Sequence, residues 1–268
     1  MIFAFDLISD LHLESWNEIC PSYMATSPIC VVAGDVGYDR TILKEFFNNL
    51  SNSYQAVFYI DGNDEHRLFS IENLHESHNE LESIISGIDK FVYLQDNVVV
   101  INGIAIVATN GWWDYGFDPT IDFDQNTQWL CDYCKTVGIE MTQDWAKKYV
   151  SMALQDMQYL CLSVERLQKH PDIKKILIVT HTVPGKNLIE HDLSLLGTYR
   201  FNITGNSMMD QVFEYDYEKK ISTWAFGHYH GDIDTVINNV RYVSNPRGRK
   251  KGAWGKAVYY PKRIVIEH

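Results

Sequence analysis

The chain has 268 residues, of which 35 are acidic and 23 are basic, so its formal net charge at pH 7 is −12. The length exceeds the usual ~100–200 residues per domain but is common for one α/β domain, and we expect a single domain over residues 1–268. The acidic charge argues against a general binder of nucleic acids or membrane surfaces. A polyanionic substrate would need a local positive centre, which bound divalent cations would supply.

The cysteines and the amino-terminal segment indicate a reducing compartment. An odd number of cysteines without a regular framework predicts free thiols, here Cys20, Cys30, Cys131, Cys134 and Cys161. The single Cys-x-x-Cys pair leaves zinc and redox interpretations open, but buried thiols are favoured. The first residues lack a basic region, unlike a signal peptide, and no apolar run approaches membrane-spanning length. We therefore expect a soluble, cytoplasmic protein that contacts no membrane.

Taken in chain order, the predicted elements begin with an alternation of strands and helices. Short apolar runs typical of buried strands are followed by helical patterns at 41–50 and at about 70–86, the runs being 2–8, 29–33 and 56–60. Each of these strands ends in a polar cluster. Next comes a hairpin of strands 98–101 and 104–108, for which Asn102-Gly103 favours a type I′ turn.

The middle of the chain contains an aromatic, acidic segment without a clean period, residues 111–138, which we interpret as a long loop or lid. Its Trp112-Trp113 pair either stacks on a substrate base or packs under the next helix. That helix is predicted at about 142–169, where apolar residues recur at helical spacing and Pro171 follows the end.

Two further strands, 175–179 and 222–226, deliver histidines at their ends. The second ends in Gly227-His228-Tyr229-His230-Gly231. Residues two apart on an extended backbone point to one side, so both imidazoles can converge on a metal. One pair supplies only two of the three or four ligands that a catalytic metal needs, and taken alone it is also compatible with two surface histidines in a turn. Strands at 232–237 and 240–244 follow, then apolar segments around Val258 and Ile264.

The polar strand ends occur in a fixed order along the chain, namely Asp10-x-His12, Gly34-Asp35, Gly62-Asn63, His181 and Gly227-His228-x-His230. This order resembles the calcineurin-like metallophosphoesterase superfamily, whose pattern runs D-x-H, G-D, G-N-H-[DE], H and G-H-x-H. The match spans positions 10 to 230, and each part follows an apolar run. The resemblance implies an α/β fold, a four-layer αββα sandwich, with a dinuclear metal site at the strand ends.

The resemblance also implies the ligand set and the chemistry. The first metal would be held by Asp10, His12, Asp35 and His230, and the second by Asp35, Asn63, His181 and His228, with Asp35 bridging. Such oxygen and nitrogen ligands suit two ions of Mn, Fe, Zn, Co or Ni without choosing among them. Two cations about 3.5–4 Å apart would activate a bridging hydroxide for in-line attack on phosphorus. The resemblance implies that Asp35 and Asn63 are catalytic residues, together with the residue that follows Asn63 in the family pattern.

That residue is Asp64, which departs from the family pattern. The family most often has a histidine here, and it is usually assigned to protonate the leaving group. Asp64 would need a raised pKa for this role, and nearby cations lower it. A diester with a good leaving group depends less on an acid, so we expect a phosphodiesterase acting on a phosphodiester or nucleotide. His66 is an alternative acid, although a lone loop histidine is more often solvated.

The last candidates lie near the end of the chain. Arg247 follows a strand and is a candidate for binding the substrate phosphate; the alternative is a solvated arginine in a turn. The basic run 247–251 leaves a nucleic-acid strand possible, although a solvated loop is favoured. Besides a hydrolase of small phosphodiesters or nucleotides, the open alternatives are a phosphomonoesterase or protein phosphatase, a nuclease of the same fold, and a non-catalytic metal-binding scaffold.

Overall fold

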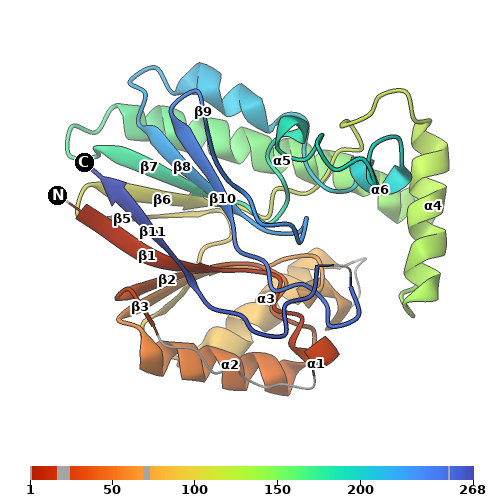
Figure 1. The fold of residues 1–268 in the computed structure, drawn as a ribbon, viewed down its shortest axis with the longest axis horizontal. Helices are drawn as coiled ribbons and strands as arrows, with labels where there is room; N and C mark the ends of the chain where they lie inside the picture. Colours follow the sequence, from red (N-terminus) through yellow and green to blue (C-terminus); the bar gives the residue numbers. More distant parts are fainter. Residues whose placement is uncertain (1, 17–24, 69–72, 253) are drawn as a thin grey trace.

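Two β-sheets form the centre of the structure, a computed structural model that describes residues 2–16, 25–68, 73–252 and 254–268. The first sheet has five strands, and β1 to β4 run parallel while β11 is antiparallel to β1. Its order is β11 (Lys262–Glu267), β1 (Ile2–Ile8), β2 (Ile29–Ala33), β3 (Ala56–Ile60) and β4 (Phe91–Tyr93). All parallel strands therefore end at the same edge, on the right in Figure 1.

The second sheet has six strands, of which β6, β7, β8 and β10 run parallel. Its order is β5 (Asn97–Ile101), β6 (Ile104–Ala108), β7 (Lys175–Val179), β8 (Ile221–Phe226), β10 (Val240–Ser244) and β9 (Asp234–Ile237). The two edge strands are joined by hairpins. Asn102 and Gly103 have φ angles of 49° and 80°, the positive values that a type I′ turn requires. The predicted hairpin is confirmed.

The two sheets pack face to face through alternating side chains. In β2, Val31 and Ala33 enter the layer between the sheets, whereas Cys30 and Val32 face outward. β6 repeats this alternation with Ile104, Ile106 and Ala108 on the inner face. A strand buried on both faces needs apolar residues at every position, which is why these strands read as continuous apolar runs.

Helices cover both outer faces. α2 (Arg40–Ser53) and α3 (Leu74–Ile85) pack on the first sheet, and the long α5 (Gln143–Gln168) packs on the second. The layers are thus helix, sheet, sheet and helix (Figure 1). The predicted α/β fold class is confirmed, and the helices expected at 41–50 and 142–169 are present with slightly different ends. For the helix expected at about 70–86, residues 69–72 lie outside the described residues.

The segment 111–138 differs from the expected long loop, because residues 123–136 form helix α4 (Phe123–Thr136). Asp122 caps it by accepting a hydrogen bond from the Gln125 backbone N–H. Trp112 and Trp113 are 2% and 4% exposed and pack on Tyr149 of α5. The base-stacking interpretation is therefore wrong, and packing against the helix is confirmed. A lid function for this segment stays a prediction.

Three smaller features complete the comparison with the sequence. The apolar segment around Val258 forms no strand, and Val258 is exposed, because only residues 262–267 pair with β1. Of the predicted free thiols, Cys30, Cys131, Cys134 and Cys161 are buried and free, and Cys20 lies outside the described residues. In the described ranges, no helix has both the length and the apolar character needed to cross a bilayer.

Short helical segments fill the connections at the right of Figure 1, where the parallel strands end. They are α1 (Leu13–Trp16), η1 (Glu65–Leu68), η2 (Lys186–Leu188) and α6 (Tyr199–Asn202). A further short helix, η3 (Met209–Tyr215), packs on α5.

Asp156 of α5 holds the connection that follows β6. Its Oδ2 accepts hydrogen bonds from the backbone N–H groups of Gly111 and Trp112, at 2.8 and 2.9 Å. Burial raises the pKa of Asp156 to about 7.

Replacing Asp156 with Asn should flatten part of the pH dependence of stability. Between its unfolded pKa of 3.8 and the folded value of about 7, the native state binds more protons at Asp156 than the unfolded state does. The free energy of unfolding therefore falls as pH rises through this window, by at most roughly 4 kcal/mol. Urea unfolding from pH 4 to pH 8 should show this fall in the parent chain and a smaller one in Asp156→Asn. The exposed Asp172→Asn is the control, and equal slopes in all three proteins would contradict the assignment.

Candidate metal centre

The carboxyl ends of five parallel strands bring the predicted ligands together. Asp10 and His12 follow β1, Asp35 follows β2, Asn63 follows β3, His181 follows β7, and His228 and His230 follow β8. The two sheets meet here through backbone contacts. The N–H of Arg247 donates to the carbonyl of Ser9 at 3.1 Å, and that of Gly248 donates to Asp10 at 2.9 Å.

The first cluster contains the four residues that the sequence assigned to one metal. The donor atoms of Asp10, His12, Asp35 and His230 all lie within 4.8 Å of one another. The Nε2 atoms of His12 and His230 are 2.8 Å apart, and His230 Nε2 is 3.5 Å from Asp10 Oδ1. His12 Nε2 lies 3.8 Å from Asp35 Oδ2. The four side chains therefore converge on one position.

The second cluster shares Asp35 with the first. Donor atoms of Asp35, His181 and His228 lie within 4.8 Å of one another. Nε2 of His181 is 3.4 Å from Asp35 Oδ1 and 3.2 Å from Asn63 Oδ1. Asp35 thus directs one carboxylate oxygen to each cluster, which is the geometry required of a bridging ligand.

Hydrogen bonds to the outer ring nitrogens determine which atoms face the clusters. The Nδ1–H of His181 donates to the carbonyl of Ala33 at 2.9 Å, and His12 Nδ1 lies 2.9 Å from Asp64 Oδ2. With the proton on Nδ1, each Nε2 presents a lone pair inward. These lone pairs meet carboxylate and amide oxygens, which are also acceptors. A cation satisfies such an arrangement, and the outer partners are those that metal-bound histidines use.

The electrostatics of the clusters also fit cations. Asp10 Oδ2 is buried and has no hydrogen-bond partner among the described residues. Burial raises the pKa of Asp10 and Asp35, but nearby histidines outweigh it and hold both below their usual range. Burial lowers the pKa of His181, yet Asp35 raises it to about 10 overall, so without a cation the carboxylates favour a proton on this ring in the place that a metal would take. The residues present therefore form a buried donor set with mixed oxygen and nitrogen atoms that attracts positive charge, which suits divalent transition metals.

The backbone at these positions adopts conformations that side chains usually avoid. Positive φ angles between 44° and 68° occur at five of the seven predicted ligands, namely Asp10, His12, Asp35, His228 and His230. Such residues cost of order 1–3 kcal/mol each and cluster at functional sites. Glycines permit the close approach of these turns: a Cβ at Gly227 would lie 2.5 Å from Asp10 Oδ2, and one at Gly62 would clash with Asp35 Oδ1.

Glu65 is a site residue to which the sequence analysis gave no role. Its carboxylate accepts hydrogen bonds from the backbone N–H groups of Asp35, Val36 and Gly62, at 3.1, 2.8 and 2.9 Å. It therefore ties the loop after β2 to the loop after β3, and so fixes the bridging Asp35 relative to Asn63. Its position at the end of the motif Gly62-Asn63-Asp64-Glu65, where the family has Asp or Glu, is the signal that could have identified it.

Asp64 lies in a contact network that differs from that of a leaving-group acid. It is 3% exposed, and its Oδ2 accepts hydrogen bonds from His12 Nδ1 and from the Arg249 guanidinium. Burial and the charge of Asp35 raise its pKa, but His12 and Arg249 bring it below its usual value. The carboxylate is thus ionised and orients the His12 ring. Its catalytic role stays a prediction, and its contacts favour positioning.

Two expectations about neighbouring residues need correction. His66 is fully buried, with Nε2 2.5 Å from Asp61 Oδ2 and Nδ1 2.6 Å from Ser77 Oγ, so the solvated-loop interpretation is wrong. Both of its ring nitrogens are directed to these partners. Arg247 is 2% exposed and its guanidinium lies 4.2 Å from the centre of the Trp16 ring. The interpretation as a solvated arginine is therefore wrong, and phosphate binding by Arg247 stays a prediction.

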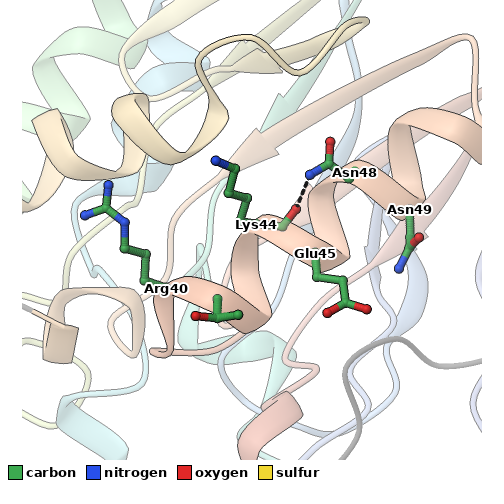
Figure 2. A pocket seen from close by; sticks show the side chains of 6 residues that line it. Arg40, Lys44, Glu45, Asn48 and Asn49 are labelled. Carbon is green, nitrogen blue, oxygen red and sulfur yellow. Dashed lines mark hydrogen bonds between the residues drawn. The ribbon is translucent and has the colours of Figure 1, made fainter.

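The basic run 247–251 is only partly a free surface. Arg249 is bound to Asp64, while Lys250 and Lys251 are exposed. A separate hollow of about 380 Å³ lies on α2, and Figure 2 shows the side chains that line it. It is lined by Arg40, Thr41, Lys44, Glu45, Asn48 and Asn49. None of the predicted ligands lines it, so it is distinct from the metal centre.

Comparison of the sequence with known proteins finds a relative of similar length. No protein-family model matches the chain. An uncharacterised protein, L509, of Acanthamoeba polyphaga mimivirus is 21% identical over 276 residues, which cover 90% of this chain and 89% of that protein. The similarity therefore extends over nearly the whole of both chains.

Two solved structures share this fold. Phosphopantetheinyl hydrolase from Mycobacterium tuberculosis superposes with a TM-score of 0.65 at 17% identity, covering 97% of this chain and 95% of that one. A protein described as a 5′-nucleotidase from Staphylococcus aureus has a TM-score of 0.53 at 11% identity, covering all of this chain and 51% of the other. At these identities the likeness establishes the common fold.

Removing the Asp64 carboxylate should weaken metal binding. Asp64→Ala leaves His12 Nδ1 without its acceptor, and the loss of such outer partners typically lowers metal affinity by about 10–100-fold. Isothermal titration of metal-stripped protein with Mn²⁺ or Zn²⁺ measures this change. Asp132→Ala, at an exposed position of α4, should bind like the parent chain. Unchanged affinity in folded Asp64→Ala would show that Asp64 does not position His12.

Proposed function

We propose that this chain is a calcineurin-like metallophosphoesterase that hydrolyses phosphoesters with two bound divalent metal ions. The observation that carries the proposal is the pair of buried donor clusters that share Asp35 at the carboxyl ends of both sheets. The full-length fold similarity to a phosphopantetheinyl hydrolase, and the fold similarity to a protein described as a 5′-nucleotidase, support the same class.

The ligand assignment follows the two clusters. Asp10, His12 and His230 complete the first position with Asp35, and His181 and His228 complete the second. Asn63 joins the second through its Oδ1, which lies beside His181 Nε2. The neutral amide adds an oxygen without adding charge. His228 fits this role because its Nε2–H donates to the carbonyl of Ile203 at 3.0 Å, which leaves Nδ1 for a metal.

The cations, when bound, lower the pKa of coordinated water and neutralise charge on the phosphoryl group. The protein contributes an arrangement that is set before the substrate arrives. Glu65 fixes the loops that carry Asp35 and Asn63, while Asp64 and Ala33 orient the His12 and His181 rings. Preorganised groups of this kind need no rearrangement during the reaction.

We further propose a phosphodiester or nucleotide as the substrate. The residue at the place of the usual acid is an ionised carboxylate held by His12 and Arg249, so it is poorly suited to protonate a leaving group. A diester that carries a good leaving group depends less on that proton. Arg249 lies beside the centre, and its positive charge favours an anionic substrate there.

The alternatives each make a different demand on the site. A phosphomonoesterase or protein phosphatase would need a proton donor other than Asp64. A nuclease would need a basic surface, whereas Lys256 is paired with Asp232 at 2.6 Å and Arg249 with Asp64. A metal-binding scaffold without activity would not need substrate access. The convergence of the predicted ligands in two clusters supports the enzyme interpretation, because a scaffold without activity could lose ligands and this chain retains them.

Hydrolysis assays on model esters test the proposal. Metal-stripped protein should hydrolyse bis-p-nitrophenyl phosphate faster than p-nitrophenyl phosphate after addition of Mn²⁺, Ni²⁺, Zn²⁺ or Co²⁺. Asp35→Asn removes the shared ligand, so it should lose at least about a hundredfold in kcat/KM and bind both metals weakly. Faster turnover of the monoester would keep the class and overturn the diester preference. Full activity in Asp35→Asn would contradict the bridging role.

Introducing the missing acid tests the reason for the preference. Asp64→His supplies a group that titrates near neutral pH, so the ratio of monoester to diester turnover should rise above that of the parent chain. Asp64→Asn is the matched control, because it removes the charge but donates no proton to the leaving group. If both variants show the same ratio as the parent, the absence of an acid does not set the preference.

A further inference from the structure

A third cluster of metal-ligating side chains lies outside the two described above. Asp61 follows β3, His66 belongs to η1 and His78 belongs to α3, so three separate elements meet here. One donor atom from each lies within 4.8 Å of the others. None of the three is among the ligands assigned to the dinuclear centre, although Asp61 stands only two residues before Asn63.

The outward atoms of this cluster already have partners. His66 Nδ1 lies 2.6 Å from Ser77 Oγ, and Asp61 Oδ1 accepts a hydrogen bond from the Tyr93 hydroxyl at 2.5 Å. The other donor atoms, Asp61 Oδ2, His66 Nε2 and His78 Nε2, face one another, and Asp61 Oδ2 also accepts a long hydrogen bond of 3.4 Å from the Asn110 side chain. Metal-bound histidines and carboxylates show this division between outer hydrogen bonds and inner donor atoms.

His78 supplies an independent observation. Its Nε2 is buried and makes no hydrogen bond to any described residue. Asp61 Oδ2 lies 3.7 Å away, which is beyond hydrogen-bonding distance. The two atoms are therefore within ion-pair distance but share no hydrogen bond, and a cation bound between them would satisfy both.

A hydrogen-bonded relay explains only part of the arrangement. Ser77, His66 and Asp61 are linked in a row like the residues that activate a nucleophile. All three are fully buried, however, so a substrate has no access to the Ser77 hydroxyl. The relay also leaves His78 unexplained, since His78 does not belong to it.

We propose that Asp61, His66 and His78 bind a further cation of the Zn²⁺ class. Two imidazole nitrogens and one carboxylate oxygen form a donor set that Zn²⁺ favours, and three protein ligands leave the fourth position of its tetrahedron to a ligand from outside the protein. Zn–N distances of about 2.0–2.1 Å require His66 and Asp61 to separate by somewhat less than ~1 Å from their present 2.5 Å. The ion would fasten α3 to the loop that carries Asn63.

The number of zinc ions bound per chain, with and without His78, tests this site. The full chain and its His78→Ala variant are stripped, saturated with Zn²⁺, desalted and measured by mass spectrometry for zinc per folded chain. We expect three ions in the parent chain and two in His78→Ala. His75→Ala, at an exposed histidine three residues earlier in α3, should keep three.

The same measurement in the Asp35→Asn background separates this site from the dinuclear centre. Asp35→Asn should retain one tightly bound zinc, and Asp35→Asn with His78→Ala should retain none. If the dinuclear centre binds no zinc, the parent chain should hold one ion and His78→Ala none, which still supports the third site. Equal zinc content with and without His78, in either background, overturns the proposal. Should His78→Ala fail to fold, His78→Gln replaces it with the same expected counts.

Discussion

The constraint on which the structure depends is the convergence of buried acceptor atoms at one edge of two sheets. Carboxylates of Asp10 and Asp35 face the imidazole nitrogens of His230 and His181, and hydrogen bonds on the outer ring nitrogens orient His12 and His181. Burying charged carboxylates costs several kcal/mol unless positive charge accompanies them, which a bound cation would supply. The left-handed backbone at five ligands shows that the fold also accepts local strain to hold this geometry.

The residue that follows Asn63, Asp64, orients a ligand and is unsuited to donating a proton. A carboxylate at Asp64 reaches His12 on one side and Arg249 on the other, so the site gains an orienting partner for a ligand and an anchored cation. The same contacts keep it ionised, which conflicts with a role in proton donation. On the proposed function, substrate preference and ligand orientation are therefore coupled through one side chain. A general comparison of motifs would record this position only as a missing histidine.

The sequence predicted the parts of the site that depend on periodicity and strand ends. Strands buried on both faces give mostly apolar runs, and each of the seven ligands lies within four residues after such a run, so their convergence at one edge could be inferred, while their division between two metals came from the family resemblance. Packing between distant parts of the chain could not be inferred in this way. The sequence left open whether the Trp112-Trp113 pair packs on α5, a helix that begins thirty residues later. The strand β4 is too short for its alternation to be recognised. The burial of His66 likewise depends on Ser77 of α3 and on the Trp112 ring, whose centre lies 5.4 Å from that of His66.

The loop from Asp61 to His66 shows why a polar stretch can be as constrained as a hydrophobic core. Its charged side chains Asp61, Asp64, Glu65 and His66 are all at most 3% exposed, and each has partners on a different element. Asp64 and Glu65 contact the residues of the two donor clusters, whereas His66 contacts α3. Because buried polar groups need partners, the backbone of this loop must satisfy both sets of contacts at once. The loop therefore links the candidate metal centre to the helix layer behind it.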